Sequence, residues 1–311
     1  MPDFAHTTWF TEQRPEYDFD FLLEPASIVL VLAAVGVAAG WRWVSTRLPQ
    51  PEMRFLGRLG GLAPWIPRIL AIHAGVSLIA QAYAGTYLAP GLDLPEGSVG
   101  TLLAIVEGAV GVWLVSGWRV RAAAALLVAA GPLGLIAYDP VAILERIDLL
   151  GIAVFLALVP PGADRHGAVD VQPADLKGPL FLMRLAAGGA LVVLSGTEKL
   201  IRPEIGLALI DRYPILNVAA TVGIEIPDLE FLRIAGAIEL LFGLLVISGA
   251  LPQVAVIVAG IPFNATLFFF GASELIGHLP VYGVMLAMLV YGSSASYAPI
   301  VPWIPNPKRG P

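Results

Sequence analysis

Cysteine is absent from the 311 residues, and charged residues make up only 14% of them. Without cysteine the chain has no disulfide, thiolate metal site, iron–sulfur cluster or Cys-x-x-Cys redox motif of its own. The low charge is equally informative, because a soluble domain carries roughly 25% charged residues. With 57% hydrophobic residues and a mean hydropathy of +0.79, the chain has too little polar surface to cover its apolar residues in water. The composition therefore predicts an integral membrane protein, in which any redox chemistry uses a bound cofactor or a partner protein.

The sequence lacks the motifs that are typical of several other classes of protein. No basic stretch is present, which argues against a nucleic-acid partner. A Walker loop, a G-x-G-x-x-G nucleotide fingerprint and a G-x-S-x-G nucleophile elbow are also missing. No catalytic residue can therefore be assigned from motifs.

Apolar stretches long enough to cross a bilayer, which takes about 20 residues, recur along the chain. Charge, proline or glycine bounds each of them, and together they predict nine transmembrane helices: 26–44, 66–88, 99–117, 120–138, 145–160, 180–200, 230–249, 251–271 and 277–293. Gly249-Ala250-Leu251-Pro252 provides the turn that divides one uncharged run too long for a single helix.

The lysines and arginines are distributed unevenly between the two sides of the predicted membrane. If the acidic residues 1–25 are exported, twelve of the 18 Lys and Arg lie on the cytoplasmic side. The remaining six are Arg14, Arg146, Lys199, Arg202, Arg212 and Arg233. This bias follows the positive-inside rule. We expect a multi-pass protein of the plasma (inner) membrane of a bacterium, with its N-terminus out and its C-terminus in.

An eleven-residue pattern, E-x-x-x-G-x-x-x-x-S-G, occurs twice, at Glu107–Gly117 and at Glu239–Gly249. A match in register at this distance indicates an internal repeat of four helices. Because four is an even number, both units enter the membrane from the same side, as parallel repeats related by an axis along the membrane normal. The predicted fold is therefore all-α, with one N-terminal helix followed by two four-helix bundles.

This reading divides the chain into six parts. They are an exported acidic tail (1–25), an N-terminal transmembrane helix (26–44), a first four-helix unit (66–160), a cytoplasmic linker (161–179), a second four-helix unit (180–293) and a cytoplasmic tail (294–311). The external connection 201–229 carries amphipathic pieces that are expected to cap the second unit.

The second unit resembles the DoxX/DoxD family of four-helix membrane proteins. The resemblance rests on Arg184-Leu-Ala-Ala-Gly188, Ser195-Gly-Thr-Glu-Lys199-Leu, Ala235-Gly-Ala-Ile-Glu239-Leu-Leu-Phe-Gly243 and Glu274-Leu-Ile-Gly-His278. The first unit looks like a degenerate copy, which keeps Arg68 and Glu107 but has Ala82-Tyr83 where Glu198-Lys199 would fall. The resemblance implies a membrane subunit of a redox-linked, quinone-interacting complex with a membrane or extracytoplasmic protein partner.

Ionisable groups inside a span cost on the order of 2.5–3.5 kcal/mol each, and therefore mark candidate sites. In the second unit they fall in the outer half, and the predicted ligand-binding residues are Glu239, Lys199, Asn264, Glu274, His278 and Glu198, with Glu107 as the equivalent in the first unit. Arg68 and Arg184 begin helices at the cytoplasmic boundary, where we expect them to snorkel toward water.

Two interpretations of the outer cluster remain open. In one, Glu239 bonds Lys199 or Asn264 and locks the helices together. In the other, the cluster lines an outward-opening pocket that binds a quinone ring or a small anion and exchanges protons with it. Two ligands, Glu274 and His278, are too few for a metal site.

No intrinsic cofactor is predicted, although a quinone is compatible with the cluster. His73 and His278 lie at different depths, so they cannot share a haem, and His73 is expected to be a helix-packing residue. Besides the redox-linked subunit, two alternatives stay open: a small-solute or ion transporter, and a purely structural subunit of a larger complex. The absence of a central Gly/Pro break in most spans argues against the transporter.

Overall fold

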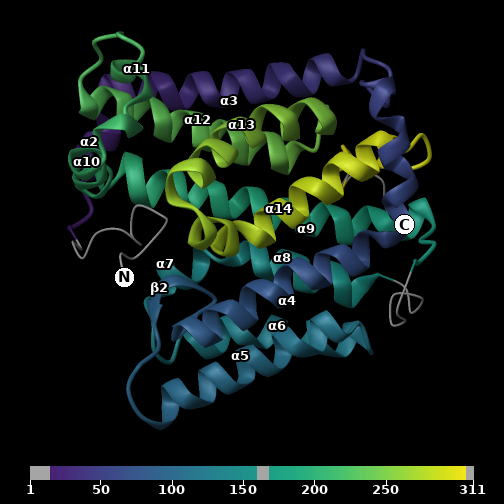
Figure 1. Ribbon diagram of the computed structural model, residues 1–311. Helices are drawn as coiled ribbons and strands as arrows, with labels where there is room; N and C mark the ends of the chain where they lie inside the picture. Colours follow the sequence, from purple (N-terminus) through teal and green to yellow (C-terminus); the bar gives the residue numbers. More distant parts are fainter. Residues whose placement is uncertain (1–14, 160–167, 306–311) are drawn as a thin grey trace.

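The computed structural model describes residues 15–159 and 168–305, and in that part it is all-α apart from one short hairpin. The long helices run roughly along one direction, and the short segments gather at the two ends (Figure 1). The long helices are α3 (Pro25–Ser45), α4 (Ile66–Ala84), α5 (Ser98–Ser116), α6 (Val120–Gly134), α8 (Ile147–Leu158), α9 (Pro173–Ser195), α12 (Asp228–Ser248), α13 (Pro252–Phe270) and α14 (Ala272–Ser293).

Shorter segments connect them. The helical ones are α2 (Phe19–Leu23), η1 (Arg54–Trp65), α7 (Pro140–Leu144), η3 (Gly196–Leu200), α10 (Pro203–Arg212), η4 (Pro214–Leu216), α11 (Val218–Thr221) and η5 (Ala298–Ile300). The hairpin pairs β1 (Thr86–Tyr87) with β2 (Ala89–Asp93) in antiparallel fashion. Residues of the predicted tails and linker that enter the charge count, namely Arg14, Arg165, Lys308 and Arg309, lie outside the described residues, as does His6.

Six helical segments among the described residues are long and apolar enough to cross a bilayer. They are Pro25–Ser45, Arg54–Ala84, Ser98–Ser116, Pro173–Leu200, Asp228–Ser248 and Glu274–Ser293. The other three predicted spans contain the shorter apolar helices Val120–Gly134, Ile147–Leu158 and Pro252–Leu267. The chain is thus an all-α protein with six candidate transmembrane helices, and its apolar surface suits a lipid bilayer.

The two copies of the repeated motif end α5 and α12 with the same turn. In each copy the serine hydroxyl, of Ser116 or Ser248, donates to the carbonyl three residues earlier and accepts from the amide two residues later. The next residue, Gly117 or Gly249, has φ of 78° or 60°, the left-handed conformation that glycine adopts without strain. Two residues further on, φ is 46° and 47° respectively. The motif is therefore a helix C-cap that sets the direction of the following helix.

The first two helices of each repeat cross at a pair of glycines. An added Cβ on Gly75 of α4 would lie 2.7 Å from the carbonyl oxygen of Gly111 of α5. In the same way, a Cβ on Gly188 of α9 would lie 2.4 Å from the carbonyl oxygen of Gly243 of α12. Only glycine permits such close backbone contact, which is how membrane helices gain packing energy without a hydrophobic driving force.

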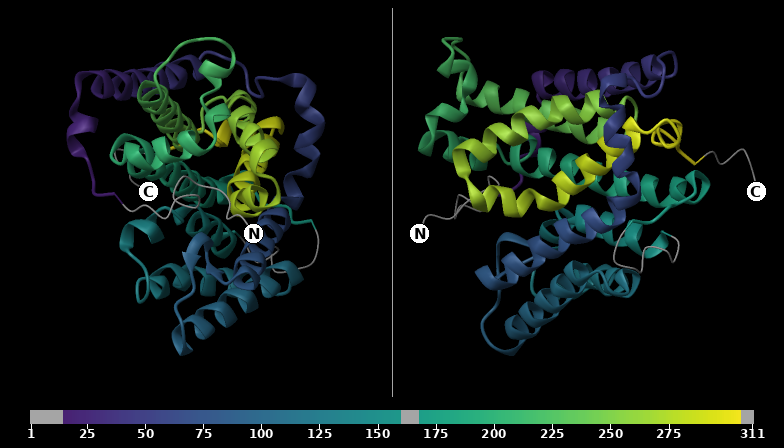
Figure 2. Two further views of the ribbon diagram at one scale, coloured as in Figure 1. Left: turned by 60° about the vertical axis from the view of Figure 1, so that its left-hand side comes forward. Right: turned by 45° about the vertical axis from the view of Figure 1, so that its right-hand side comes forward.

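We call α4, α5, α6 and α8 the first unit, and α9, α12, α13 and α14 the second unit. The units lie beside each other, and α3 packs on α12, on the side of the second unit away from the first (Figures 1 and 2). Where the units meet, α8 packs extensively on α9, and α14 on α4. The fourth helix of each unit, α8 or α14, thus packs more extensively on the first helix of the other unit than on the first helix of its own unit. We call this region the junction.

Arginine side chains satisfy helix C-termini at one end of the molecule. Arg68 Nη1 donates to Leu114 O at 2.9 Å, and its Nη2 donates to Val115 O. Arg184 donates to Ile247 O at 3.1 Å and to Trp303 O at 2.7 Å, and it is completely buried. The expectation that Arg184 snorkels to water is therefore wrong, because the free carbonyls of the α12 C-terminus bind its guanidinium inside the protein.

Substitution at the glycine crossing should destabilise the protein far more than substitution of its neighbour. Gly188→Ala places a methyl group against the Gly243 carbonyl and should lower the free energy of unfolding by about 2 kcal/mol. Gly189→Ala is the matched control, because nothing lies within 4 Å of its added Cβ, and alanine favours the helix. Thermal unfolding of the two variants in detergent measures the difference. Equal melting temperatures would contradict the crossing described here.

Candidate functional site

Lys199 and Glu239 form the centre of the predicted outer cluster. Lys199 Nζ donates to Glu239 Oε2 at 2.7 Å and lies 3.9 Å from Glu198 Oε2. Lys199 and Glu198 belong to η3, a single π-helical stretch that continues α9. A π-helical stretch changes the rotation of successive side chains and is often found at functional sites. The expected contact between the sixth and seventh predicted spans is thus present.

Glu274 and His278 lie one turn apart on α14, as their spacing predicts. His278 Nδ1 is 3.2 Å from Glu274 Oε1, and both side chains are almost fully buried. Lys199 itself lies beside two carboxylates, those of Glu239 and Glu198.

A second set of ionisable residues, which the sequence analysis missed, adjoins this cluster from the first unit. Glu145 and Arg146 occupy the connection between α7 and α8, and Asp148 begins α8. Glu145 Oε1 accepts a hydrogen bond of 2.7 Å from Thr197 Oγ1 of η3, and Arg202 Nη2 is 3.9 Å away. The run Glu145-Arg-Ile-Asp148 carries the signal, but its place at the start of the predicted span 145–160 hides it, because charged residues are common at the ends of transmembrane helices.

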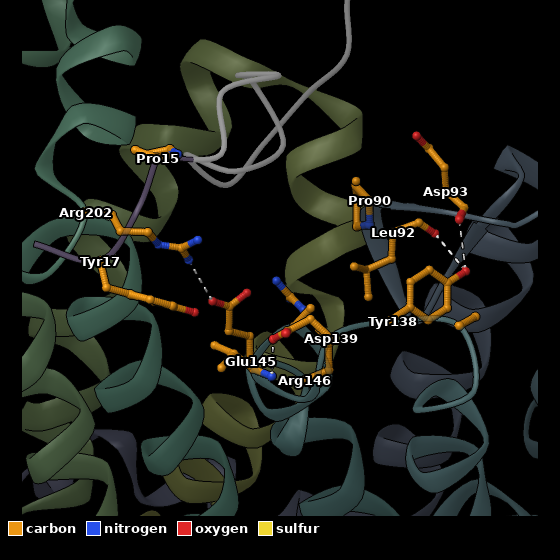
Figure 3. A pocket seen from close by; sticks show the side chains of 14 residues that line it. Pro15, Tyr17, Pro90, Leu92, Asp93, Tyr138, Asp139, Glu145, Arg146 and Arg202 are labelled. Carbon is orange, nitrogen blue, oxygen red and sulfur yellow. Dashed lines mark hydrogen bonds and ion pairs between the residues drawn. The ribbon is translucent and has the colours of Figure 1, made fainter.

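An open cavity of about 590 Å³ lies above these residues, bounded by the segment before α2, the β-hairpin, the stretch around α7 and Arg202. Figure 3 shows Glu145 and Arg146 beneath it, Arg202 and Tyr17 on one side, and Tyr138 on the other. Its lining also includes Pro15, Pro90, Gly91, Leu92, Asp93, Ala137, Asp139, Val141 and Ala142. The pocket is amphipathic, because two aromatic rings and aliphatic side chains alternate with two cations and three carboxylates.

Burial changes the acidity of two groups in this pocket, both outside the candidate transmembrane helices. Removal from water raises the pKa of the Glu145 carboxyl, and the nearby Glu198 carboxylate raises it further. Burial likewise raises the pKa of the Tyr138 phenol to about 12. Tyr138 therefore remains a neutral donor, bonded to Asp93 O at 3.0 Å, and the Glu145 carboxyl takes up a proton at a higher pH than an exposed glutamate does.

The structure corrects the predicted site in two respects. Asn264 does not join the cluster: its side chain is exposed on α13 and donates to Gly260 O of its own helix at 2.7 Å. The pocket is not lined by Glu239, Lys199, Glu274 or His278. The sequence could not locate it, because its residues come from the segment before α2, the β-hairpin, the stretch around α7 and Arg202, which are far apart in the chain.

Glu107 occupies a separate place in the first unit. Its Oε1 accepts a hydrogen bond of 2.7 Å from the backbone amide of Leu88 in the β-hairpin. Glu107 is thus equivalent to Glu239 in the repeat, but a backbone amide takes the place of the lysine. His73 packs against Gly283 of α14 and its ring Nδ1 is 2.8 Å from Ile69 O, which confirms its packing role.

Among the described residues, no three His, Asp or Glu side chains come together in a way that would hold a metal ion. The arrangement instead suits hydrogen bonding and proton exchange. A buried carboxyl beside an open pocket can give a proton to a bound group, and the neighbouring cations can stabilise the negative charge that results.

Removing Lys199 should harm stability more than neutralising Glu239. Lys199→Met leaves the carboxylates of Glu239 and Glu198 without their shared cation and should cost about 2 kcal/mol or more in unfolding free energy. Glu239→Gln leaves the ammonium beside Glu198, so the loss should be smaller. The double variant should be more stable than Lys199→Met alone, as thermal unfolding at neutral pH can measure. An equal loss in the two single variants would show that the carboxylates do not share the lysine.

No family model, curated protein or solved structure matches this chain. The functional assignment therefore depends on the geometry of the site.

Proposed function

We propose that the chain is a DoxX-like membrane protein that acts as the ligand-binding subunit of a redox-linked, quinone-interacting membrane complex. In this proposal nine helices cross the bacterial plasma membrane, with the N-terminus out and the C-terminus in. An extracytoplasmic partner contacts the outer face. The two identical C-cap turns and the two glycine crossings support a parallel repeat of four helices, because the same side-chain chemistry recurs at equivalent places.

One observation carries the functional part of the proposal: an open pocket adjoins a chain of ionisable groups, of which Glu145 and Glu198 are buried. Glu145 beneath the pocket bonds Thr197, and Thr197 is the neighbour of Glu198 on η3. Glu198 is near Lys199, which binds Glu239. Such groups are costly in a membrane and persist mainly where they have a function. When Glu145 gains or loses a proton, the polar side chains between Glu145 and Glu239 can compensate the change in its charge.

The pocket suits a small acidic ligand with a planar or compact body. Arg146 and Arg202 supply positive charge, Tyr17 and Tyr138 supply aromatic surface, and Glu145 supplies a hydrogen-bond donor when it is protonated. A small anion reaches this opening directly from water. A quinone ring fits the same chemistry, and a redox-linked complex requires proton exchange whenever such a ring is reduced.

Transport is the weaker alternative, since the polar groups stop halfway along the helices. Glu239 is eleven residues into α12, about 17 Å from its start at a rise of 1.5 Å per residue. One turn beyond it the α12 backbone touches α9 at Gly243. At the junction itself, Gly151 of α8 lies against Met183 and Ala186 of α9, and Gly283 of α14 against His73 of α4. These contacts favour a site that opens to one side.

Ligand binding should depend on the protonation of Glu145. We expect thiosulfate, used as a small anionic probe, to bind about tenfold more weakly at pH 8 than at pH 5, because ionised Glu145 repels it. Glu145→Gln resembles the protonated form and should remove this pH dependence. Arg202→Gln should weaken binding at every pH, whereas Glu204→Gln, outside the pocket, should change nothing. Calorimetry with thiosulfate and with a short-chain benzoquinone measures these constants.

Two results would contradict the assignment. One is the absence of binding by either probe in the intact protein. The other is an unchanged pH profile in Glu145→Gln.

The proposed topology can be tested directly, because the chain has no cysteine. Single cysteines at Glu204, in α10, and at Asp170, before α9, replace exposed residues. An impermeant thiol reagent added to intact cells should label Glu204→Cys, and should label Asp170→Cys only after the membrane is permeabilised. Labelling of both positions in intact cells would exclude the parallel four-helix repeat.

A further inference from the structure

A second cavity, distinct from the outer pocket, lies on the apolar surface of α13 and α14. It is a groove of about 490 Å³, and its lining includes Ile257, Gly260, Asn264, Tyr282, Met285 and Leu289. The residues beside it are strongly exposed: Ile261 is 67% exposed and Ile257 43%. In a membrane this surface faces hydrocarbon, so the groove is open to lipid.

Asn264 is an unusual residue for that environment. It is the thirteenth residue of α13, about 18 Å from the start of the helix, and thus lies well inside the bilayer. Its Nδ2 donates to Gly260 O of the same helix. Among the described residues no donor reaches its Oδ1, and the second Nδ2 hydrogen also has no acceptor there. An exposed amide in hydrocarbon with only one of its hydrogen bonds formed is costly, so a molecule that fills the groove would gain by bonding to its remaining donor and acceptor.

Tyr282 provides a second polar atom at the same place. Its hydroxyl donates to Phe263 O at 3.0 Å, which leaves the phenolic oxygen as an acceptor. The carbonyl of Phe263 is about one turn above the carbonyl of Gly260, so Tyr282 and Asn264 both bond the α13 backbone near Pro262. The rest of the lining is aliphatic, apart from the thioether of Met285.

We propose that this groove binds a lipid-soluble molecule with a hydroxyl or carbonyl oxygen at the end of an apolar body. The amide of Asn264 both donates and accepts, which matches a hydroxyl group, and its free hydrogen also matches a carbonyl. An ordinary phospholipid is the poorer match, because its polar atoms lie at the bilayer surface and only its acyl chain reaches this depth. The proposal depends on the membrane location of α13 and not on the outer pocket.

The groove also adjoins the buried cluster of the junction. The Phe263 ring packs edge-on against His278 with centroids 5.2 Å apart, and Tyr282 packs against His278 at 6.4 Å. His278 in turn pairs with Glu274. One layer of side chains therefore separates the lipid-facing groove from the ionisable groups.

Photolabelling of the full-length protein in nanodiscs tests the inference. The probes are a diazirine-bearing long-chain alcohol and the alkane of the same length that lacks the hydroxyl group. We expect the alcohol to label peptides of α13 and α14 at least five times more than the alkane does. Asn264→Leu should reduce labelling by the alcohol to the level of the alkane.

Two further variants separate loss of the site from loss of the fold. Gly260→Leu should reduce labelling by both probes, because its side chain fills the groove, while the Cβ itself meets Asn264 Nδ2 and Met285 Cε only at 3.7 and 3.9 Å. Thr266→Val is the control: it removes a polar group of α13 that bonds Phe263 O and is not part of the groove lining. Its labelling should equal that of the unmodified protein.

Three outcomes would overturn the proposal. Equal labelling by alcohol and alkane would mean that the groove takes any acyl chain. Unchanged labelling in Asn264→Leu would mean that the amide recognises nothing. Cross-links between two copies of the chain through α13 would mean that the face is a subunit contact. Thiosulfate binding to Asn264→Leu, measured in parallel, reports on the outer pocket separately.

Discussion

The cost of placing a charge away from water governs where the buried ionisable side chains of the described residues lie. Lipid cannot solvate such a group, so each one is stabilised by a partner inside the protein. Lys199 pairs with Glu239 where η3 meets α12, and Glu274 pairs with His278 on α14. Arg68, Arg184 and Arg42 instead bind carbonyl oxygens at the C-terminus of α5 or α12. The same constraint thus produces a polar layer toward one end and a set of capped helices at the other.

The repeat shows which features two equivalent units must share and which are free to differ. The glycine crossing and the Ser–Gly cap are common to both, since they determine how the first two helices pack and where the third begins. The partner of the conserved carboxylate differs: Glu239 binds an ammonium, whereas Glu107 binds the amide of Leu88, which has φ of 59°. A hairpin that follows α4 provides this amide in the position where the second unit has η3. The carboxylate is satisfied in both units by different means.

The all-α fold and the candidate membrane helices could be predicted, because long apolar stretches identify membrane helices in a sequence. Glu239 and Lys199 could be paired because only a few charges lie inside the spans, so few partners exist. The outer pocket could not be predicted, since its walls come from the segment before α2, the hairpin, α7 and Arg202, which are far apart in sequence. Asn264 was misplaced for a related reason: a depth estimate says how far along a helix a residue lies, but not which face it occupies. Arg184 was misjudged because sequence does not show that a helix C-terminus lies beside it.

The position of the junction also explains why the polar cluster is accessible from one side only. Around Glu145 the polypeptide is a connection between short helices, so side chains diverge and leave an open cavity. Farther along the helices, the backbones come into close contact at four glycines, Gly151, Gly188, Gly243 and Gly283. Small residues at a helix crossing leave no cavity, because they let the backbones pack directly against each other. The His278 ring contacts the rings of Phe263 and Tyr282, so one layer of side chains separates the Glu274–His278 pair from the apolar groove on α13 and α14. In the function proposed above, this arrangement is suited to exchange between an aqueous and a lipid-soluble reactant, and it is poorly suited to carrying a solute across the membrane.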